Sequence, residues 1–258
     1  RMIEEVTPKK SLGQNFLKNQ ITINLIDDIL DIKEHDKVIE IGPGTGAITD
    51  NILSKTKNYI GIEKDRKLSE KLLKKYKSEV KILNQDVMDS NFSKLFDKNI
   101  RLVGNIPYNI STQIITKCIL ERENIISAHF MMQKEFVDRI QSNFGSKIFG
   151  RLSVYCQVFF NVNKYIDIPA DDFYPKPKVE SSFFSLVPKS KIVLRNDEIE
   201  GFLKFVKEIF NTRRKKIKNC IEIKNHNMYV NIEKRAEQLS IIDMVDLYRE
   251  LKNDGSFI

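Results

Sequence analysis

Val38-Ile-Glu-Ile-Gly-Pro-Gly-Thr-Gly-Ala47 is the stretch that decides the fold of this chain. Its first four residues include three β-branched apolar side chains, which are typical of a buried strand. The glycines at positions 42, 44 and 46 then allow a sharp turn and let a ligand approach the backbone closely. The stretch also matches G-x-G-x-x-A, so by itself it predicts a nucleotide-like ligand without separating a dinucleotide fold from other cofactor-binding α/β folds.

Strands and helices alternate on both sides of this stretch. A helix-like run at 21–30 precedes it, and a second lies at 68–76. Strand-like runs occur at residues 37–41, 58–62, 80–83 and 100–103. This alternation predicts an α/β fold with a parallel, doubly wound, Rossmann-like sheet.

Each of the four predicted strands is followed by a residue that can face a ligand: Gly42, Glu63, Asp86 and Asn105. The ligand crevice of an open parallel sheet lies outside the carboxyl ends of its strands, so we expect the four to converge. Glu63 lies about twenty residues beyond the glycines, where a carboxylate accepts hydrogen bonds from ribose hydroxyls. Asp86, one strand further, is placed to accept a hydrogen bond from an adenine amino group.

The second half of the chain predicts an antiparallel edge to this sheet and then a helical domain. Residues 152–160 and 182–186 are β-rich, and a turn-rich stretch separates them. Beyond Pro188 the apolar periodicity becomes helical, over residues 202–210, 213–223 and 241–251. We therefore predict a cofactor-binding catalytic domain at 1–188 and a small all-α domain at 189–258.

Composition predicts a globular protein with a polyanionic partner. The chain has 258 residues, of which 41% are hydrophobic, and it has no long apolar run, so we expect no association with membranes. The first ten residues contain no apolar stretch, so we expect no secretory signal and a cytoplasmic location. Forty-three basic and 35 acidic residues give a net charge of +8, which favours a polyanion only mildly.

The cysteines and histidines form no recognisable metal-binding pattern. The three cysteines lie far apart without a C-x-x-C pair, and the histidines, His35, His129 and His226, do not cluster with them. We therefore expect neither a disulfide framework nor a metal site.

Asn105-Ile-Pro-Tyr108 is the sharpest local signal for chemistry, because packing does not require this combination at a strand end. Taken alone, a turn with a half-buried Tyr108 would also explain it. Beside a ligand crevice, the side-chain carbonyl of Asn105 and the backbone carbonyl of Pro107 could accept both N–H bonds of an adenine amino group. A pyramidal nitrogen would then aim its lone pair at a methyl group on a sulfonium cofactor, and positioning would replace a general base. Tyr108 would stack on a single-stranded or flipped base.

Six blocks of the sequence, in order and spacing, resemble the ribosomal RNA adenine dimethyltransferases over most of the chain. They are Gly-Gln-Asn-Phe-Leu (13–17), Glu-Ile-Gly-Pro-Gly-Thr-Gly (40–46), Gln-Asp (85–86), Asn-Ile-Pro-Tyr-Asn-Ile-Ser-Thr (105–112), Gln-Lys-Glu (133–135) and Pro-Lys-Pro-Lys-Val-Glu-Ser (175–181). The resemblance implies a class I methyltransferase that uses S-adenosyl-L-methionine and has ribosomal RNA as its partner, and we expect a monomer.

Two branches of this family differ in substrate. The opening Gly-Gln-Asn-Phe-Leu block and Lys-Arg-Ala-Glu-Gln-Leu-Ser at 234–240 resemble the KsgA branch more than the Erm branch. The KsgA branch implies N6,N6-dimethylation of two adjacent adenines near the 3′ end of small-subunit (16S) RNA, linked to ribosome maturation within an immature subunit. An Erm-type enzyme, which modifies one large-subunit (23S) adenine and confers antibiotic resistance, is the alternative.

The resemblance also implies roles for individual residues. Segment 13–17 would fold over the cofactor, although composition alone would interpret it as a helix-capping loop. The implied cofactor contacts are Gln14, Asn15, Leu17, Gly42, Gly44, Glu63, Asp86 and Asn105. The implied catalytic residues are Asn105, Pro107, Tyr108 and Phe173. Phe173 would form the second wall of the adenine clamp, with Tyr174 as the alternative.

A basic stretch between Lys204 and Lys218 contains seven basic residues and one acidic residue. A solvated helix end would explain it, but we favour phosphate contacts that position RNA, because the family has a basic run here. Lys216 stands where many members have a threonine. The predicted RNA-binding residues are Arg213, Arg214, Lys215 and Lys216, with Lys134, Arg139 and Arg151 extending the surface.

Two other classes of function share part of this pattern. A dehydrogenase would use the glycines and Glu63, but would leave Asn105 to Tyr108 and the basic stretch without a role. A ribosome-assembly or transcription factor on the same scaffold would bind RNA or DNA without catalysis. The intact carboxylates and the Asn-Ile-Pro-Tyr motif argue against lost activity but not against an added binding role.

Overall fold

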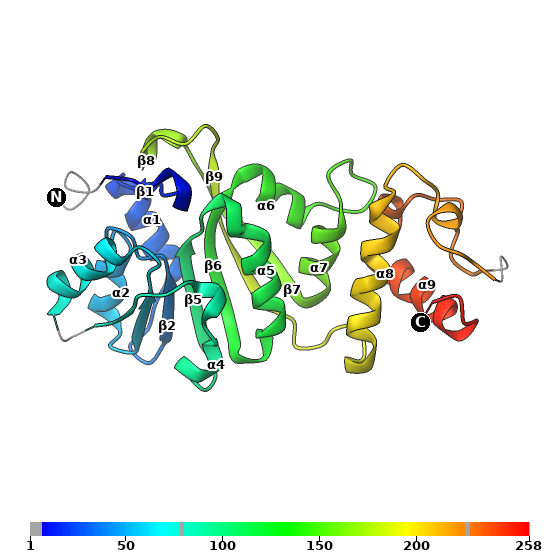
Figure 1. The fold of residues 1–258 in the computed structure, drawn as a ribbon, viewed down its shortest axis with the longest axis horizontal. Coiled ribbons are helices and arrows are strands. Elements are labelled where there is room, and N and C mark those ends of the chain that lie inside the picture. The colour runs from blue at the N-terminus through cyan, green and yellow to red at the C-terminus, as the bar shows by residue number, and fades with distance from the viewer. Residues whose placement is uncertain (1–6, 78–79, 225–227, 258) are drawn as a thin grey trace. The chain divides into compact units, whose positions relative to one another are not determined.

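The computed structural model describes residues 7–77, 80–224 and 228–257. These residues form two compact units, which are described separately (Figure 1). The first contains the described residues up to Val137 together with Val162–Pro188, and the second contains Asp138–Asn161 and the described residues from Lys189 on. Residues 138–161, predicted to lie in the first domain, therefore join the second unit. His226 and the first six residues lie outside the described parts of the chain.

Seven described strands form one sheet, in the order β4-β3-β2-β5-β6-β9-β7, and all of it except the first two residues of β7 belongs to the first unit. The parallel strands are β2 (Lys37–Ile41), β3 (Tyr59–Ile62), β4 (Lys81–Leu83), β5 (Ile100–Asn105) and β6 (Ile125–Gln133). β9 (Ser181–Pro188) pairs antiparallel with β6, and β7 (Phe160–Ile168) is the edge strand. The prediction of a mostly parallel sheet with an antiparallel edge is confirmed.

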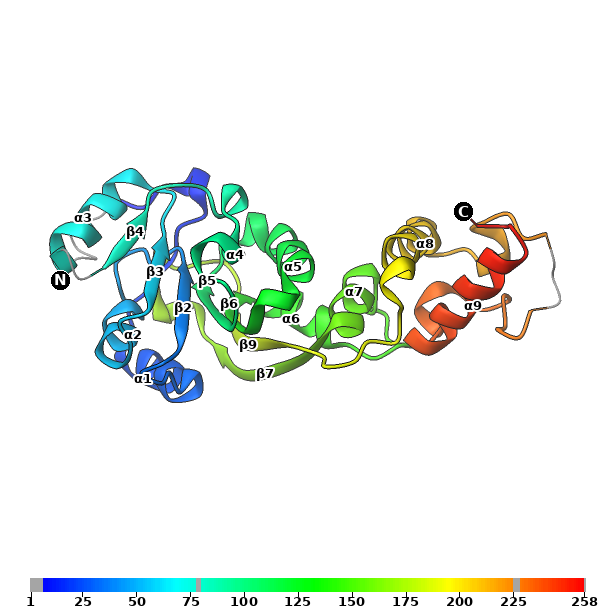
Figure 2. The ribbon, with the colours of Figure 1, turned by 90° about the horizontal axis from the view of Figure 1, so that it is seen from below.

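Helices cover both faces of the parallel strands, which explains why those strands are apolar on both sides. α1 and α2 lie on one face, and α4 and α5 lie on the other (Figure 2). The helices of this part of the chain are α1 (Gln20–Leu30), α2 (Thr49–Lys55), α3 (Arg66–Tyr76), α4 (Phe92–Leu95), α5 (Ser111–Leu120) and α6 (Lys134–Gln141). Four of the five residues of β2 are buried, as the β-branched run at this position predicts.

A two-stranded sheet ties the N-terminal segment to a distant part of the first unit. β1 (Phe16–Leu17) pairs antiparallel with β8 (Phe173–Tyr174), so that Leu17 lies opposite Phe173. The backbone N–H of Lys18 donates to the carbonyl of Asp172 at 2.8 Å, just before β8. The segment that precedes α1 is therefore held at its C-terminal end by main-chain hydrogen bonds.

The second unit is built from helices α7 (Arg151–Phe159), α8 (Ile199–Asn211) and α9 (Ile241–Asn253). α8 buries an apolar face formed by Phe202, Phe205, Val206 and Ile209. Short 3-10 helices in the described chain lie at Lys10–Leu12, Val87–Asp89, Tyr108–Ile110, Arg122–Asn124, Ala170–Asp172, Asn196–Glu198, Ile217–Asn219 and Ala236–Gln238. No described helix combines the length and the apolarity that crossing a bilayer requires.

Two secondary-structure predictions in this part of the chain are wrong. Residues 152–159 lie in helix α7 rather than in a strand, because Gly150 N–H donates to Ser153 Oγ at 3.0 Å and caps the helix start, and only Phe160 belongs to a strand. β7 takes the place at the sheet edge instead. Residues 213–223 contain one 3-10 turn, so Arg213 to Lys215 lie in turn and bend positions after α8 and Lys216 forms an isolated β-bridge with Arg235, none of them on an α-helix.

Candidate active site

A pocket lies outside the carboxyl ends of β2 and β5, where the strand order reverses. This switch point is where open α/β sheets bind ligands. Segment 11–17 closes one side of the pocket, and the 105–110 segment closes another. The pocket is lined by all eight predicted cofactor residues, Gln14, Asn15, Leu17, Gly42, Gly44, Glu63, Asp86 and Asn105. We call it the donor pocket.

The glycine turn and Glu63 form one hydrogen-bonded unit. Gly44 has a φ of +61° and donates its N–H to Glu63 Oε2 at 3.0 Å, while Asp65 N–H donates to Oε1 at 2.8 Å. A Cβ on Gly44 would lie 3.2 Å from the ring of Phe16, so the close contact between this turn and Phe16 requires a glycine. Burial raises the pKa of Glu63, and the two N–H groups oppose that shift. Glu63 is thereby aimed at one edge of the pocket.

Asp86 is held in its ionised form on the same side of the pocket. Its carboxylate accepts hydrogen bonds from Met88 N–H at 2.9 Å and from Lys64 Nζ at 2.7 Å. The lysine is the largest cause that lowers the pKa of Asp86. An ionised carboxylate can accept further hydrogen bonds from an amino group, because each oxygen has two lone-pair directions.

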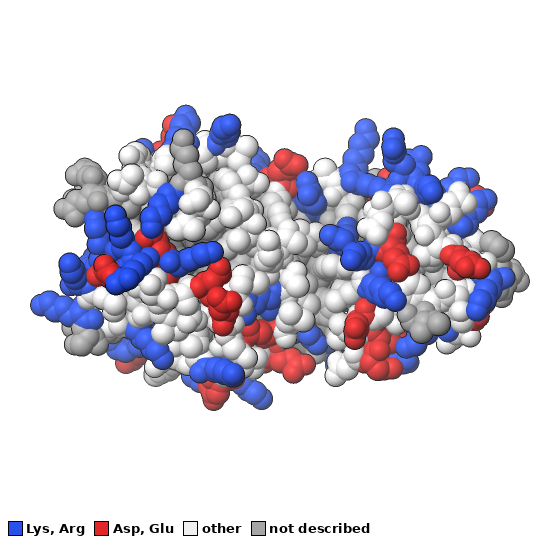
Figure 3. All heavy atoms as spheres, in the orientation of Figure 1, with Lys and Arg blue, Asp and Glu red and all other residues white. Residues whose placement is uncertain are grey.

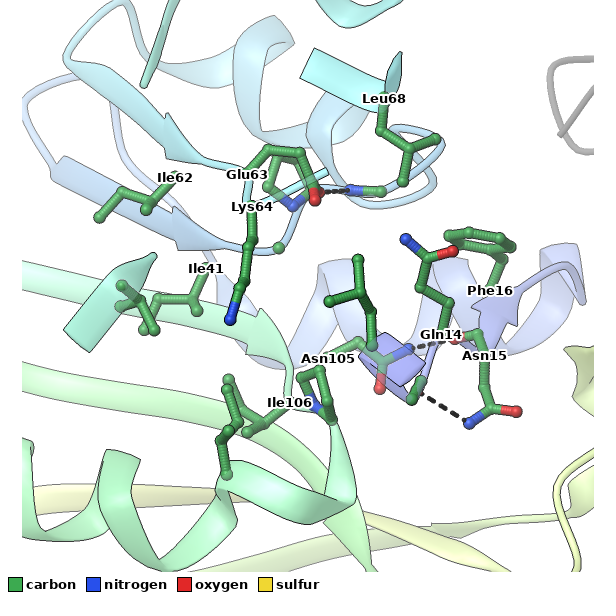
Figure 4. A pocket seen from close by; sticks show the side chains of 18 of the residues that line it. Gln14, Asn15, Phe16, Ile41, Ile62, Glu63, Lys64, Leu68, Asn105 and Ile106 are labelled. Carbon is green, nitrogen blue, oxygen red and sulfur yellow. Dashed lines mark hydrogen bonds between the residues drawn. The ribbon is translucent and has the colours of Figure 1, made fainter. Parts of the chain in front are cut away.

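Asn105 is oriented by the N-terminal segment. Its side-chain nitrogen Nδ2 donates to the backbone carbonyl of Asn15 at 2.7 Å, and Nδ2 of Asn15 donates to the carbonyl of Gly13 at 3.2 Å (Figure 4). A Cβ on Gly13 would lie 3.3 Å from Cβ of Pro107, so the two segments are in close contact. Because Nδ2 of Asn105 is engaged, its side-chain oxygen Oδ1 remains to accept a hydrogen bond from a ligand.

A second set of contacts holds the beginning of the N-terminal segment. Gln14 Nε2 donates to Asp65 Oδ2 at 3.0 Å, and Lys9 Nζ lies 2.9 Å from the same oxygen. Lys9 N–H donates to Gln14 Oε1 at 2.7 Å. Asp65 also caps α3 by accepting Lys67 N–H, and its side chain is buried. We call the contacts of Lys9 and Gln14 with Asp65 the Asp65 latch.

The two aromatic residues predicted to clamp the substrate base differ in position. Tyr108 lines the donor pocket, and its hydroxyl lies 3.1 Å from Ser181 Oγ on β9. Phe173 does not line the pocket and is only 1% exposed, because pairing of β8 with β1 turns it into the core beside Leu17. Tyr174, the alternative, is 45% exposed.

Glu40, which lies in β2 just before the glycine turn, is a buried carboxyl group with a raised pKa. It accepts hydrogen bonds from Tyr59 Oη at 2.6 Å and Thr49 Oγ1 at 2.7 Å, and it is 2% exposed. Burial raises the pKa of Glu40 to about 7. Sequence reasoning did not single out Glu40, Asp65 or Ser181. Glu40 and Ser181 stand within the quoted blocks 40–46 and 175–181, which gave them no role, and Asp65 precedes a helical run as a capping aspartate would.

The predicted RNA-binding residues divide into paired and solvent-directed cations. Arg213 donates to the carbonyls of Lys147 and Phe149 and pairs with Glu237, and Lys216 pairs with Glu233 at 2.8 Å. In the first unit, Lys134 pairs with Glu180 and Asp167, and these carboxylates raise its pKa. Arg151, Arg214 and Lys215 are exposed. The backbone carbonyl of Arg139 accepts the Ser153 hydroxyl at 2.6 Å.

Within the described residues, no three histidine, cysteine, aspartate or glutamate side chains come together as metal ligands would. Cys118 and Cys156 are buried, and none of the described cysteines forms a disulfide.

A mostly parallel sheet in this order, with the glycine turn after β2 and polar residues after the next strands, is the fold of the class I methyltransferases, as the similar structures below confirm. A family model described as ribosomal RNA adenine dimethylase matches residues 6–253, and the chain belongs to this family. It is therefore an enzyme of the methyltransferase class.

Similar proteins agree with this assignment. "Ribosomal RNA small subunit methyltransferase A" of Francisella tularensis subsp. novicida is 42% identical over 253 residues, covering 93% of this chain and 95% of that protein. The crystal structure of a dimethyladenosine transferase from Plasmodium falciparum has a TM-score of 0.80 at 25% identity, over 94% of this chain and 99% of that one. The 23S rRNA methyltransferase ErmE, at 22% identity and a TM-score of 0.73 over 92% and 99%, shares the fold.

Proposed function

We propose that this enzyme transfers methyl groups from S-adenosyl-L-methionine to the exocyclic N6 of two adjacent adenines near the 3′ end of small-subunit (16S) ribosomal RNA. Each adenine would become N6,N6-dimethyladenine. The observation that carries the proposal is the orientation of Asn105, whose amide nitrogen is engaged by the Asn15 carbonyl. Its oxygen is then presented as a fixed acceptor for an amino group.

The residues of the donor pocket fit S-adenosyl-L-methionine. Glu63 suits the two ribose hydroxyls and Asp86 suits the adenine amino group, since carboxylates accept from both kinds of donor. Ile62 and Val87 supply buried apolar surface for a flat ring. When bound, the cofactor supplies an electrophilic methyl group on a sulfonium sulfur.

The chain's own residues would prepare the target nitrogen for transfer. Asn105 Oδ1 and the Pro107 carbonyl would accept the two N–H bonds of the amino group, which favours a pyramidal nitrogen whose lone pair is less delocalised into the ring. Held in this way by Asn105 and Pro107, the nitrogen would present its lone pair to the methyl group, and after transfer its proton would leave to solvent. Fixed acceptors that stabilise developing charge supply the largest catalytic effects in many enzymes. In a second round the monomethylated nitrogen has one N–H left, which one of the two acceptors would hold, and a second transfer would complete the dimethylation.

The choice of the small subunit rests on relatives. The Francisella proteins at 42% identity carry the name of a small-subunit enzyme, whereas the likeness to ErmE is one of fold. We extend the proposal to action on an immature subunit in the cytoplasm, as a monomer, with a part in ribosome maturation.

The test is incubation with labelled S-adenosyl-L-methionine and, separately, unmethylated small and large subunits, followed by mapping of the label. We expect label on two adjacent adenines of the small-subunit RNA. Label on the large subunit alone would contradict the proposal and support the Erm-type alternative. Calorimetric binding of NAD in place of S-adenosyl-L-methionine would favour a dehydrogenase.

A further inference from the structure

An apolar loop projects from the second unit between α6 and α7. Phe144 is 55% exposed and Ile148 is 43% exposed, although residues of both types are usually buried. Phe149, beside them, is buried and packs edge-on against Phe210 of α8. The loop, which comprises residues 143–149, is thus anchored on one side and leaves two large apolar side chains in solvent.

The same loop is fixed by hydrogen bonds to the segments after α8. Arg213 donates to the carbonyls of Lys147 and Phe149, and Gly145 N–H donates to the carbonyl of Glu237 at 2.6 Å. Glu237 also pairs with Arg213 at 3.3 Å. An exposed aromatic on a fixed loop loses little conformational entropy when it binds, so it is suited to recognition.

Basic side chains accompany this apolar surface. Lys147 is an exposed residue of the loop. Arg214 and Lys215 are also exposed, and they directly follow Arg213, whose side chain holds the loop by hydrogen bonds. Figure 3 shows basic side chains gathered beyond the C-terminal end of α8. An exposed ring and a lysine on one loop, with further cations on the segment that holds this loop, match the chemistry of an unpaired nucleobase and its phosphates.

We propose that residues 143–149 form an RNA-binding surface on which Phe144 stacks on an unpaired nucleobase, while Lys147, Arg214 and Lys215 contact the phosphates. This inference deepens the proposed function and rests on RNA being the substrate. Arg213 is then a positioning residue that fixes the loop through its carbonyls. A protein partner would suit the apolar side chains but would not use the adjacent cations.

The experiment measures affinity for deproteinised small-subunit RNA at fixed salt, with the full-length chain. We expect Phe144→Ala to weaken binding by about 5- to 150-fold, the range for loss of one base–aromatic stack. Phe144→Tyr should restore binding, whereas Phe144→Leu, which is apolar but has no ring face, should not. The slope of affinity against salt should stay unchanged, because no charge is removed.

Leu120→Ala, which removes an exposed apolar side chain from the first unit, is the matched control and should bind normally. Thermal midpoints and the KM for S-adenosyl-L-methionine should not move in any of these variants. Equal RNA binding by Phe144→Ala and wild type would overturn the inference, as would wild-type protein that does not bind the RNA. A loss seen only on assembled subunits would assign the surface to a protein instead. Methyl label on the large subunit would contradict the proposed function while leaving the Phe144 effect in place.

Discussion

The donor pocket of the first unit and the basic surface of the second unit, by which we mean Arg213, Arg214, Lys215 and Lys216, are organised differently. In the pocket, Glu63 and Asn105 are each fixed by hydrogen bonds to backbone groups. On the basic surface, Arg214 and Lys215 are exposed, whereas the neighbouring Arg213 is engaged with loop carbonyls. In the pocket, the hydrogen bonds that orient Glu63 and Asn105 indicate which atoms can bind a ligand. On the basic surface, the number of cations in the sequence overestimates how many are available to RNA, because Arg213 is already engaged.

The sharpest way to test the pocket side of this comparison is Asn105→Ala. The variant loses the acceptor for the target amino group and the hydrogen bond to Asn15. We expect the rate of methyl transfer to fall by about 10²- to 10³-fold, measured in a single turnover with labelled donor. Asn163→Ala, on the edge strand, is the control. Undiminished transfer by Asn105→Ala would refute the mechanism.

The second prediction concerns Glu40, a buried carboxyl group at the pocket that has no counterpart on the basic surface. The pKa of Glu40 is raised from its ordinary value of 4.5 to about 7, so between these values the unfolded chain has released a proton that the folded chain keeps. Wild-type stability is therefore lost as the pH rises through this interval. Glu40→Gln keeps an acceptor for Tyr59 and Thr49 but cannot ionise.

Urea unfolding of both proteins at about pH 5 and about pH 8 measures this effect. The free energy of unfolding of Glu40→Gln, relative to wild type, should rise by about 2 to 3 kcal/mol between the two conditions. A difference that does not change with pH would show that Glu40 does not keep its proton in the folded protein.

The third prediction tests whether the Asp65 latch contributes to ligand binding in the donor pocket. Asp65→Ser keeps a capping side chain for α3 but loses the contacts with Lys9 and Gln14. Because the segment that they hold closes the pocket, we expect the affinity for S-adenosylhomocysteine to fall about 5- to 10-fold with little change in kcat. Calorimetric titration measures it. Glu70→Ala, an exposed carboxylate on the same helix, should bind normally, and equal weakening in both variants would argue against the latch.

The smallest expected effects lie on the basic surface. Arg214→Ala should weaken RNA binding a few-fold, about 2- to 5-fold, and reduce the slope of log affinity against log salt by about 1. Lys216→Ala should change the RNA affinity and the salt slope less than Arg214→Ala does, because Lys216 is paired with Glu233. Affinities measured over a salt series decide between them. Identical slopes for the two variants would remove the distinction between paired and solvent-directed cations.

That the strand-end residues would converge on one pocket could be predicted, because strand ends are set by local patterns. Gly42, Glu63, Asp86 and Asn105 each follow a recognisable strand, and parallel strands bring their carboxyl ends to one edge. The Asp65 latch could not be predicted in this way, since Gln14 and Asp65 are 51 positions apart. Only the folded chain shows that they meet.

The wrong predictions have tertiary causes. Val154 and Val158 favour a strand by propensity, but the cap at Gly150 and Ser153 makes their segment helical. Residues 213–223 have helical periodicity, but Arg213 is engaged by the loop carbonyls instead. The burial of Phe173 follows from its pairing with Leu17, which no local pattern encodes.

The pairing of β1 with β8 has a consequence for synthesis of the protein. Translation produces Phe16 and Leu17 early, but their partners Phe173 and Tyr174 leave the ribosome only after the parallel strands have been made. A nascent chain that ends before residue 173 can form the glycine turn, yet it lacks the strand that holds the cover of the pocket. The segment that covers the donor pocket therefore obtains its β8 partner only late in translation.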